Sequence, residues 1–136
     1  MATQTVTPEE YKAMVRSRWS EEEFTREVID LAKRNGWRSA HFRPGRTAKG
    51  DWRTAVQGDG KGFPDLLLVR GPRQVNACSR PIWKKAAMIV AELKVGTNRA
   101  SNEQLHWLEA FDKIDGVHTF IWYPHDWNEI ERVLGS

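Results

Sequence analysis

The chain has 136 residues, of which 40% are hydrophobic and 29% are charged, and these values are typical of a single domain with a hydrophobic core. No apolar stretch approaches the length of a membrane span and no secretory signal opens the chain, so we expect neither a membrane protein nor a secreted one. The single Cys78 excludes an internal disulfide and favours the reducing cytoplasm.

The net charge of +3 conceals three segments of different sign. Residues 1–32 sum to −3, residues 33–99 to +11 and residues 100–136 to −5. A strongly basic middle favours a polyanionic partner, most simply a nucleic acid, although a solubilising surface would show the same excess of Lys and Arg.

Two helices are predicted in the N-terminal part. The first lies in "TVTPEEYKAMV", which opens with a capping box and a proline at the first helical position. The second lies in "WSEEEFTREVIDLAKRNGW", where Ser20 is the cap, an apolar stripe starts at Phe24 and Asn-Gly ends the helix. We expect residues 1–18 to form a helical extension and residues 19–136 to form one domain.

The middle of the chain is typical of strands separated by long connections. "WRSAHF" is a short strand, "FPDLLLV" a second and "AAMIVAELKV" a third. Residues 43–62 are rich in glycine and show no periodicity, so we predict a long loop, and such loops in compact domains are usually functional or mobile. "RGPRQVNACSRPIWKK" is predicted to be a connection or a hairpin insertion.

The C-terminal part predicts a helix in "SNEQLHWLEAFDKIDG", a strand in "VHTFIWYP" and a helix in "HDWNEIERVL". The order over the whole chain is then α-α-β-β-β-α-β-α. Strands and helices mixed on this scale indicate an α/β domain with a central sheet flanked by helices.

The strand "AAMIVAELKV" carries two charges, Glu92 and Lys94, inside an apolar run. Positions two apart in a strand point to the same face, and a buried charge without a partner is strongly destabilising, so both side chains need partners. Asp65 begins the preceding strand. If the two strands are antiparallel neighbours, two carboxylates and an ammonium meet at one edge of the sheet.

Such a cluster has a chemical use. Two carboxylates a few ångströms apart are ligands suited to Mg²⁺ or Mn²⁺, which prefer hard oxygen donors. A bound divalent ion can generate hydroxide and stabilise charge on a phosphoryl group, and a neighbouring lysine can orient the water or neutralise developing charge. In a basic domain the natural substrate of such a metal site is a phosphodiester. The alternative role for the three charged residues is a buried structural ion pair.

The same residues carry a resemblance to a known family. "PD" at 64–65 followed by "ELK" at 92–94 resembles the signature of PD-(D/E)XK nucleases. "SEEEF", "GWRSAHFRPGR", "GDGKGFPDLLLV", "AELKV", "SNEQLHWL" and "IWYPHDWNEIERVL" come in the order and approximate spacing of the VRR-NUC domain, the virus-type replication-repair nucleases. The resemblance covers roughly residues 19–134 and is strongest to the compact stand-alone members of phages and bacteria.

The resemblance implies a restriction-endonuclease-like core and divalent-metal-dependent cleavage of DNA. By position it makes Asp65 and Glu92 the metal ligands, Lys94 the catalytic lysine and Gln104 a residue beside the site. Glu21 corresponds to the acidic residue of the first core helix, and could reach the metal through water.

Two of these residues have alternative roles. At 100° per residue Glu21 shares a helix face with Phe24, so we expect it to point toward the core, but acids in a first turn also simply complement the helix dipole. Gln104 could instead complete a capping box with Ser101. Thr25 occupies a position where the family often has glutamine.

The expected DNA contacts lie mainly in the basic middle segment. A histidine at position 41 could donate to a phosphate or assist near the metal, or be a half-buried strand residue. Trp52 could stack on an unpaired base or anchor its loop. The residues expected to contact DNA are His41, Arg43, Arg46, Lys49, Trp52, Arg53 and Lys61.

The sequence therefore predicts a metal-dependent DNA endonuclease that uses Mg²⁺ or Mn²⁺ and no organic cofactor. The family resemblance further implies a phage or bacterial protein of the host cytoplasm that acts as a homodimer on branched, junction or flap DNA. A DNA-binding module that keeps the fold without cutting is the alternative, and an RNA-directed nuclease would share the same site.

Overall fold

The computed structural model describes residues 5–42, 44–46, 52–54 and 58–136. In these residues the helices are α1 (Pro8–Ser17), α2 (Glu21–Arg34), α3 (Asn102–Asp112) and α4 (Trp127–Gly135), with a 3-10 turn, η1, at Pro124–Asp126. The strands are β1 (Arg38–His41), β2 (Pro44–Arg46), β3 (Trp52–Thr54), β4 (Leu66–Arg70), β5 (Arg73–Ala77), β6 (Arg80–Lys84), β7 (Ala87–Leu93) and β8 (Val117–Trp122).

The central sheet has four strands in the order β1-β4-β7-β8. β4 pairs antiparallel with both β1 and β7, whereas β8 runs parallel to β7. A parallel pair needs a crossover connection, and α3 supplies it between β7 and β8. The prediction of an α/β fold with a mixed sheet and flanking helices is therefore confirmed.

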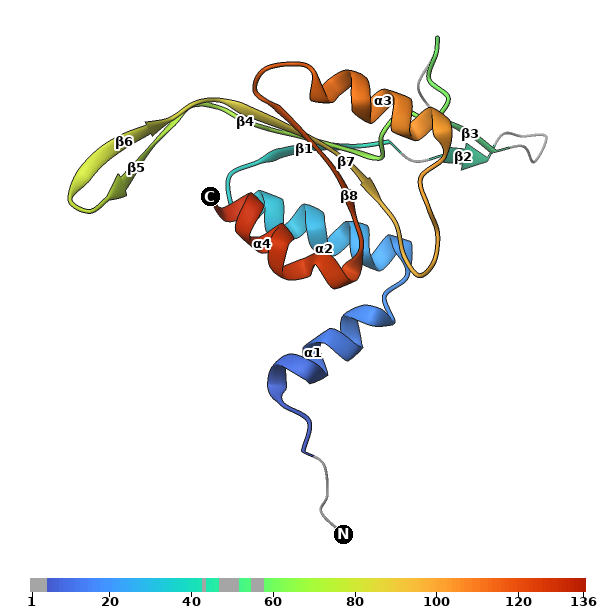
Figure 1. The fold of residues 1–136 in the computed structure, drawn as a ribbon, viewed down its shortest axis with the longest axis horizontal. Helices are drawn as coiled ribbons and strands as arrows, with labels where there is room; N and C mark the ends of the chain where they lie inside the picture. Colours follow the sequence, from blue (N-terminus) through green and yellow to red (C-terminus); the bar gives the residue numbers. More distant parts are fainter. Residues whose placement is uncertain (1–4, 43, 47–51, 55–57) are drawn as a thin grey trace.

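Helices cover both faces of this sheet, as Figure 1 shows: α2 and α4 lie on one face and α3 on the other. The main hydrophobic cluster fills the space between the sheet and the α2–α4 layer. Its fully buried members include Phe24 and Val28 from α2, Leu66 from β4, Ala91 from β7 and Ile130 from α4. The opposite face, beneath α3, carries the polar residues of the candidate site.

The local sequence explains why α2 forms and how it packs. Ser20 caps the helix by accepting a hydrogen bond from the backbone N–H of Glu23. Phe24, Val28 and Ala32 follow at four-residue spacing and are all 0% exposed. Burying the first two of these side chains stabilises the fold by about 1.5–3 kcal/mol each, so the stripe holds α2 on the sheet.

Two further hairpins accompany the central sheet. Strands β5 and β6 form an antiparallel pair, which confirms the hairpin insertion allowed by the sequence. Strands β2 and β3 form another pair, with Pro44 opposite Thr54 and Arg46 opposite Trp52. The prediction of a long loop over 43–62 is wrong for residues 44–46 and 52–54, which form strands too short to show a period of two.

Helix α1 lies at the periphery of the molecule in Figure 1, where it contacts η1, and none of its residues is buried. Beyond it, Trp19 packs edge-on against Trp127 of α4, with ring centroids 5.3 Å apart. Within the described part of the chain, no helix combines the length and the apolar character that crossing a bilayer requires.

Candidate active site

Asp65 and Glu92 are brought together by the antiparallel pairing of β4 and β7. Leu66 lies opposite Ala91, so one further step in the register places Asp65 opposite Glu92. The backbone N–H of Leu93 donates to Oδ2 of Asp65 at 3.2 Å and fixes that carboxylate beside the end of β7. As the sequence predicts, the start of β4 lies beside the end of β7.

The Glu92 side chain is 0% exposed, although it carries a carboxyl group. Its Oε2 accepts a hydrogen bond of 3.1 Å from the side-chain amide of Gln104 on α3. Its Oε1 is buried and has no hydrogen-bond partner among the described residues. A buried oxygen of this kind is strongly destabilising unless a donor or a cation is bound beside it, so this atom fits the role of metal ligand.

The pKa of Glu92 is raised to about 9. Burial is the largest cause, a hydrogen bond between the protonated Glu92 carboxyl and the Asp65 side chain and the negative charge of Asp65 act in the same direction, and the charge of Lys94 opposes them. The carboxyl therefore holds a proton at neutral pH unless a cation compensates its charge. Two carboxyl groups this close repel each other when both are ionised, and a divalent ion between them removes that repulsion.

Lys94 follows the last residue of β7, and its backbone N–H continues the pairing with β8 by donating to the carbonyl of Trp122 at 2.9 Å. The Lys94 side chain is partly exposed. It lies two positions after Glu92, on the same side of the strand, and its charge acts on the Glu92 carboxyl. A positive charge thus acts on the buried carboxyl pair from a residue that also reaches solvent.

Gln104 fulfils both roles that the sequence left open. With Ser101 it forms a complete capping box, in which its Oε1 accepts from the backbone N–H of Ser101 at 2.8 Å. Its Nε2 is then the group that donates to Glu92. Because one end of the amide is held by the helix cap, the donor end is directed at the carboxyl pair.

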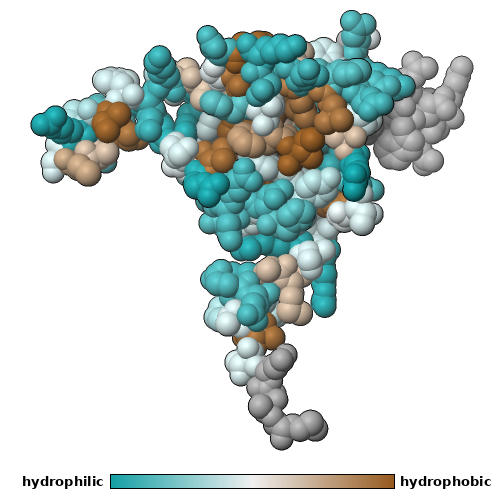
Figure 2. Space-filling view, viewed as in Figure 1, coloured by the Kyte–Doolittle hydropathy of each residue, from teal (hydrophilic) through white to brown (hydrophobic). Residues whose placement is uncertain are grey.

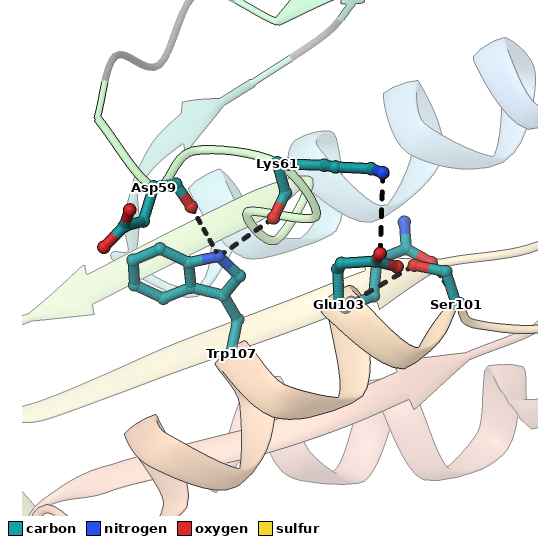
Figure 3. Close-up of polar contacts among 6 residues, drawn as sticks. Asp59, Lys61, Ser101, Glu103 and Trp107 are labelled. Atoms are coloured by element: carbon teal, nitrogen blue, oxygen red, sulfur yellow. Dashed lines mark hydrogen bonds and ion pairs between the residues drawn. The ribbon is translucent and has the colours of Figure 1, made fainter.

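A second contact, shown in Figure 3, fastens the segment before Asp65 to α3. The indole N–H of Trp107 donates to the carbonyls of both Asp59 and Lys61, each at 3.2 Å. The Lys61 ammonium lies 3.5 Å from a carboxylate oxygen of Glu103. We name these contacts of residues 59–62 with α3 the loop clamp.

Gly62 allows the closest approach in the loop clamp. Its φ is +80°, and a Cβ at this position would lie 2.6 Å from Cβ of Glu103 and 2.8 Å from the backbone nitrogen of Gln104. The sequence alone gives no role to Gly62, and it predicts a core position for Trp107, which is half-buried in the structure. The only signal in the sequence is that Trp107 follows Gln104 by three residues on one helix.

The prediction from helix geometry that Glu21 points toward the core is wrong. Glu21 is exposed, and its helix packs on the sheet face opposite to α3. Helical side chains lean toward the N-terminus, so the first residue of α2 extends past the helix end instead of into the core. Among the described residues, no cluster of three or more His, Cys, Asp or Glu side chains is placed to hold a metal ion. A water-mediated role for Glu21 stays a prediction.

The residues expected to contact DNA belong to several elements, and their role stays a prediction. His41 ends β1 opposite Leu66, is exposed rather than half-buried, and lines a surface hollow of about 300 Å³ on the α2 side. Lys61 belongs to the loop clamp. Arg46 lies in β2, Trp52 and Arg53 lie in β3, and Arg43 and Lys49 lie outside the described residues.

Comparison of the chain with protein-family models, with curated proteins and with solved structures finds no match. The geometry of Asp65, Glu92, Lys94 and Gln104 is therefore the basis on which a function can be argued.

Proposed function

We propose that this protein is a divalent-metal-dependent DNA endonuclease whose metal site is formed by Asp65 and Glu92. The observation that carries the proposal is the buried Oε1 of Glu92, which accepts no hydrogen bond from a donor among the described residues and stands beside the carboxyl group of Asp65. A structural ion pair would satisfy such an oxygen with a protein donor. Mg²⁺ or Mn²⁺ bound by two carboxylates and several waters satisfies it equally well.

The side chains around the pair suit hydrolysis of a phosphodiester. A bound divalent ion lowers the pKa of a coordinated water and stabilises negative charge on a phosphoryl group. Gln104 holds Oε2 of Glu92 and thereby directs Oε1 toward the ligand position. Lys94, whose charge acts on Glu92, orients the attacking water or neutralises the charge that develops on the phosphate.

The fold and the charge distribution support DNA as the substrate. The placement of "PD" just before β4 and of "ELK" at the end of β7, two adjacent antiparallel strands, is consistent with the restriction-endonuclease-like core of PD-(D/E)XK nucleases, and specifically with a VRR-NUC domain. The segment 33–99, which contains Asp65, Glu92 and Lys94, has a charge of +11 and suits a polyanion. Preference for branched DNA and action as a homodimer belong to the same proposal.

Cleavage of a panel of labelled substrates tests the function. The panel contains a four-way junction, a flap, plain duplex and single-stranded RNA, each incubated with Mg²⁺ and with EDTA. We expect metal-dependent cuts in DNA, and a loss of at least about a hundredfold in rate for Asp65→Asn and for Lys94→Ala. Lys113→Ala, an exposed change at the end of α3, serves as the control and retains full activity.

The possible outcomes separate the rival functions. DNA binding without metal-dependent cleavage of any substrate would contradict the proposal and favour a DNA-binding module that does not cut. Cleavage restricted to RNA would retain the metal site but overturn the choice of substrate.

A further inference from the structure

The β5–β6 hairpin is a two-stranded ribbon separate from the central sheet. In Figure 1 it projects away from the helices and the sheet. Its register pairs Gln74 with Trp83 and Val75 with Ile82, and its turn is formed by Cys78 and Ser79, both with positive φ. An isolated hairpin is only marginally stable in water, so an exposed one of this length favours a role in binding.

The β5–β6 hairpin exposes an aromatic side chain among cations. Trp83 is 69% exposed and Ile82 is 44% exposed, and Figure 2 shows apolar surface on the hairpin at the far end from the helices. No acidic residue occurs anywhere from Leu66 to Ala91. The basic residues of the hairpin and its flank are Arg73, Arg80, Lys84 and Lys85.

The two faces of the ribbon differ in character. Cross-strand partners share a face, so Trp83 lies with Gln74, and Asn76 lies on the same side two pairs further along. The opposite face carries Ile82 and Val75, between Arg80 and Lys84. One face thus offers an aromatic ring and side-chain amides, and the whole ribbon is rimmed by positive charge.

We propose that the β5–β6 hairpin is a DNA-binding arm that contacts the duplex beside the cleavage site. The inference rests on the proposed nuclease function for the identity of the duplex. A two-stranded β-ribbon fits the major groove of B-DNA, cations on the ribbon pair with phosphates on the groove walls, and amide side chains can bond to base edges. Trp83 supplies an aromatic face that packs against bases or sugars.

Charge argues for DNA over a second copy of the chain as the occupant. In a symmetric dimer the same surface meets itself, so a hairpin-to-hairpin contact would bring four cations against four cations. A polyanion removes that repulsion and releases counterions when it binds.

Measuring DNA affinity at equilibrium in the absence of metal separates the contribution of the hairpin to binding from any effect on cleavage. Fluorescence anisotropy with a labelled duplex and a labelled four-way junction, in EDTA, gives the affinity at several salt concentrations. For Lys84→Ala/Lys85→Ala we expect the negative slope of the logarithm of the association constant against the logarithm of the salt concentration to become shallower by about 1.8. For Trp83→Ala we expect a loss of about tenfold in affinity, most of which Trp83→Phe restores. Lys113→Ala/Arg132→Ala, which removes two exposed charges elsewhere, leaves the affinity unchanged.

Cys78, the only cysteine of the chain, lies exposed in the hairpin turn and gives a direct test. A photoreactive maleimide on Cys78 is expected to crosslink to the DNA. The control carries Cys78→Ser and Glu131→Cys, which moves the probe to the exposed side of α4, and should give no DNA adduct. An adduct to a second protein chain, or no adduct under conditions where DNA is bound, would overturn the inference in favour of a dimer contact or an unrelated DNA surface.

The two proposals fail separately. If the wild type cuts DNA while the hairpin variants bind and cut as well as it does, the hairpin inference is wrong and the nuclease proposal stands. If the hairpin crosslinks to DNA but no substrate is cut with any divalent metal, the hairpin inference stands and the nuclease proposal is wrong.

Discussion

The side-chain amide of Gln104 lies 3.1 Å from Oε2 of Glu92 and joins the start of α3 to the end of β7. The opposite end of the same amide is held by the Ser101 backbone. A single side chain therefore completes a helix cap and holds one oxygen of a buried carboxyl, whose other oxygen accepts no hydrogen bond from the described residues. The predictions below test this arrangement, the carboxyl pair and the loop clamp.

Variants of Gln104 and Ser101 distinguish the contribution of the helix cap from the contribution of the hydrogen bond to Glu92. Gln104→Ala leaves Oε2 of Glu92 buried without a donor and removes half of the capping box, so we expect a loss of about 1–3 kcal/mol in the free energy of unfolding and weaker binding of Mg²⁺. Ser101→Ala removes the cap alone, at a cost of about 1 kcal/mol, and should leave metal affinity unchanged. Urea denaturation and calorimetric titration with Mg²⁺ measure the two effects, and equal metal affinities in both variants would contradict the role given to Gln104.

The stability of the metal-free protein should depend on the pH through Glu92. Its folded pKa of about 9 lies above its ordinary value of 4.5, so the folded state binds the proton more tightly than the unfolded state. The stabilisation is full below the ordinary value and is lost as the pH rises toward about 9. We therefore expect the melting temperature in EDTA to fall between about pH 6 and about pH 9.

Glu92→Gln removes the titrating group and should flatten that pH profile. Added Mg²⁺ should act in the opposite direction and stabilise most at high pH, because the ion binds the ionised carboxylates. A melting temperature that rises with pH in EDTA would show that the carboxyl pair is not protonated in the folded state.

A crystal soaked in Mn²⁺ tests the metal ligands without any assay of activity. We expect an anomalous peak within about 2.3 Å of carboxylate oxygens of both Asp65 and Glu92, with waters completing the coordination. Asp65→Asn should abolish the peak. A peak that contacts only one of the two carboxylates, or lies elsewhere, would disprove the shared site.

The loop clamp predicts different costs for two glycines with the same backbone conformation. Gly58 and Gly62 have φ of +78° and +80°, but no atom lies within 4 Å of a Cβ at Gly58. Gly58→Ala should therefore cost only the strain of the left-handed conformation, about 1–2 kcal/mol. Gly62→Ala adds a clash with the start of α3 and should cost about 3 kcal/mol or more.

Gly62→Ala should also reduce DNA cleavage at temperatures where the protein is still folded, because the clash displaces the segment that leads into Asp65. Circular dichroism establishes the folded fraction, and single-turnover cleavage measures the rate. If Gly58→Ala and Gly62→Ala behave alike in both measurements, the loop clamp does not position the site.

Much of this fold follows from patterns that a single sequence displays. The stripe that starts at Phe24 marks the buried face of α2, and the apolar run around Glu92 marks β7 as a strand in the core. A charge inside such a run needs a polar partner, so the position of Glu92 predicts a partner nearby, and Asp65 at the start of the preceding strand is a candidate. The convergence of these two residues could be predicted because antiparallel pairing has a fixed geometry.

The features that could not be predicted depend on tertiary contacts, on the ends of helices or on very short strands. Glu21 has the correct helical phase for the core, but phase does not tell whether the first residue of a helix extends beyond the layer it covers. The close approach at Gly62 arises only when the loop meets α3, and no local pattern reports it. Strands β2 and β3 are too short for a periodic signal.

Strand β4 fixes the spacing between the two DNA contacts proposed here. Asp65 precedes its first residue, and Arg70 ends it. The Arg70 guanidinium lies over the Trp37 ring at 4.2 Å and donates to the Asn35 and Leu134 carbonyls, so the base of the hairpin is fixed to the helical layer. Five residues of extended chain span about 17 Å, which equals about five base pairs of B-DNA. The length of β4 thus sets a minimum distance between the two contacts. The DNA that the protein protects should extend at least that far from the scissile phosphate on the hairpin side.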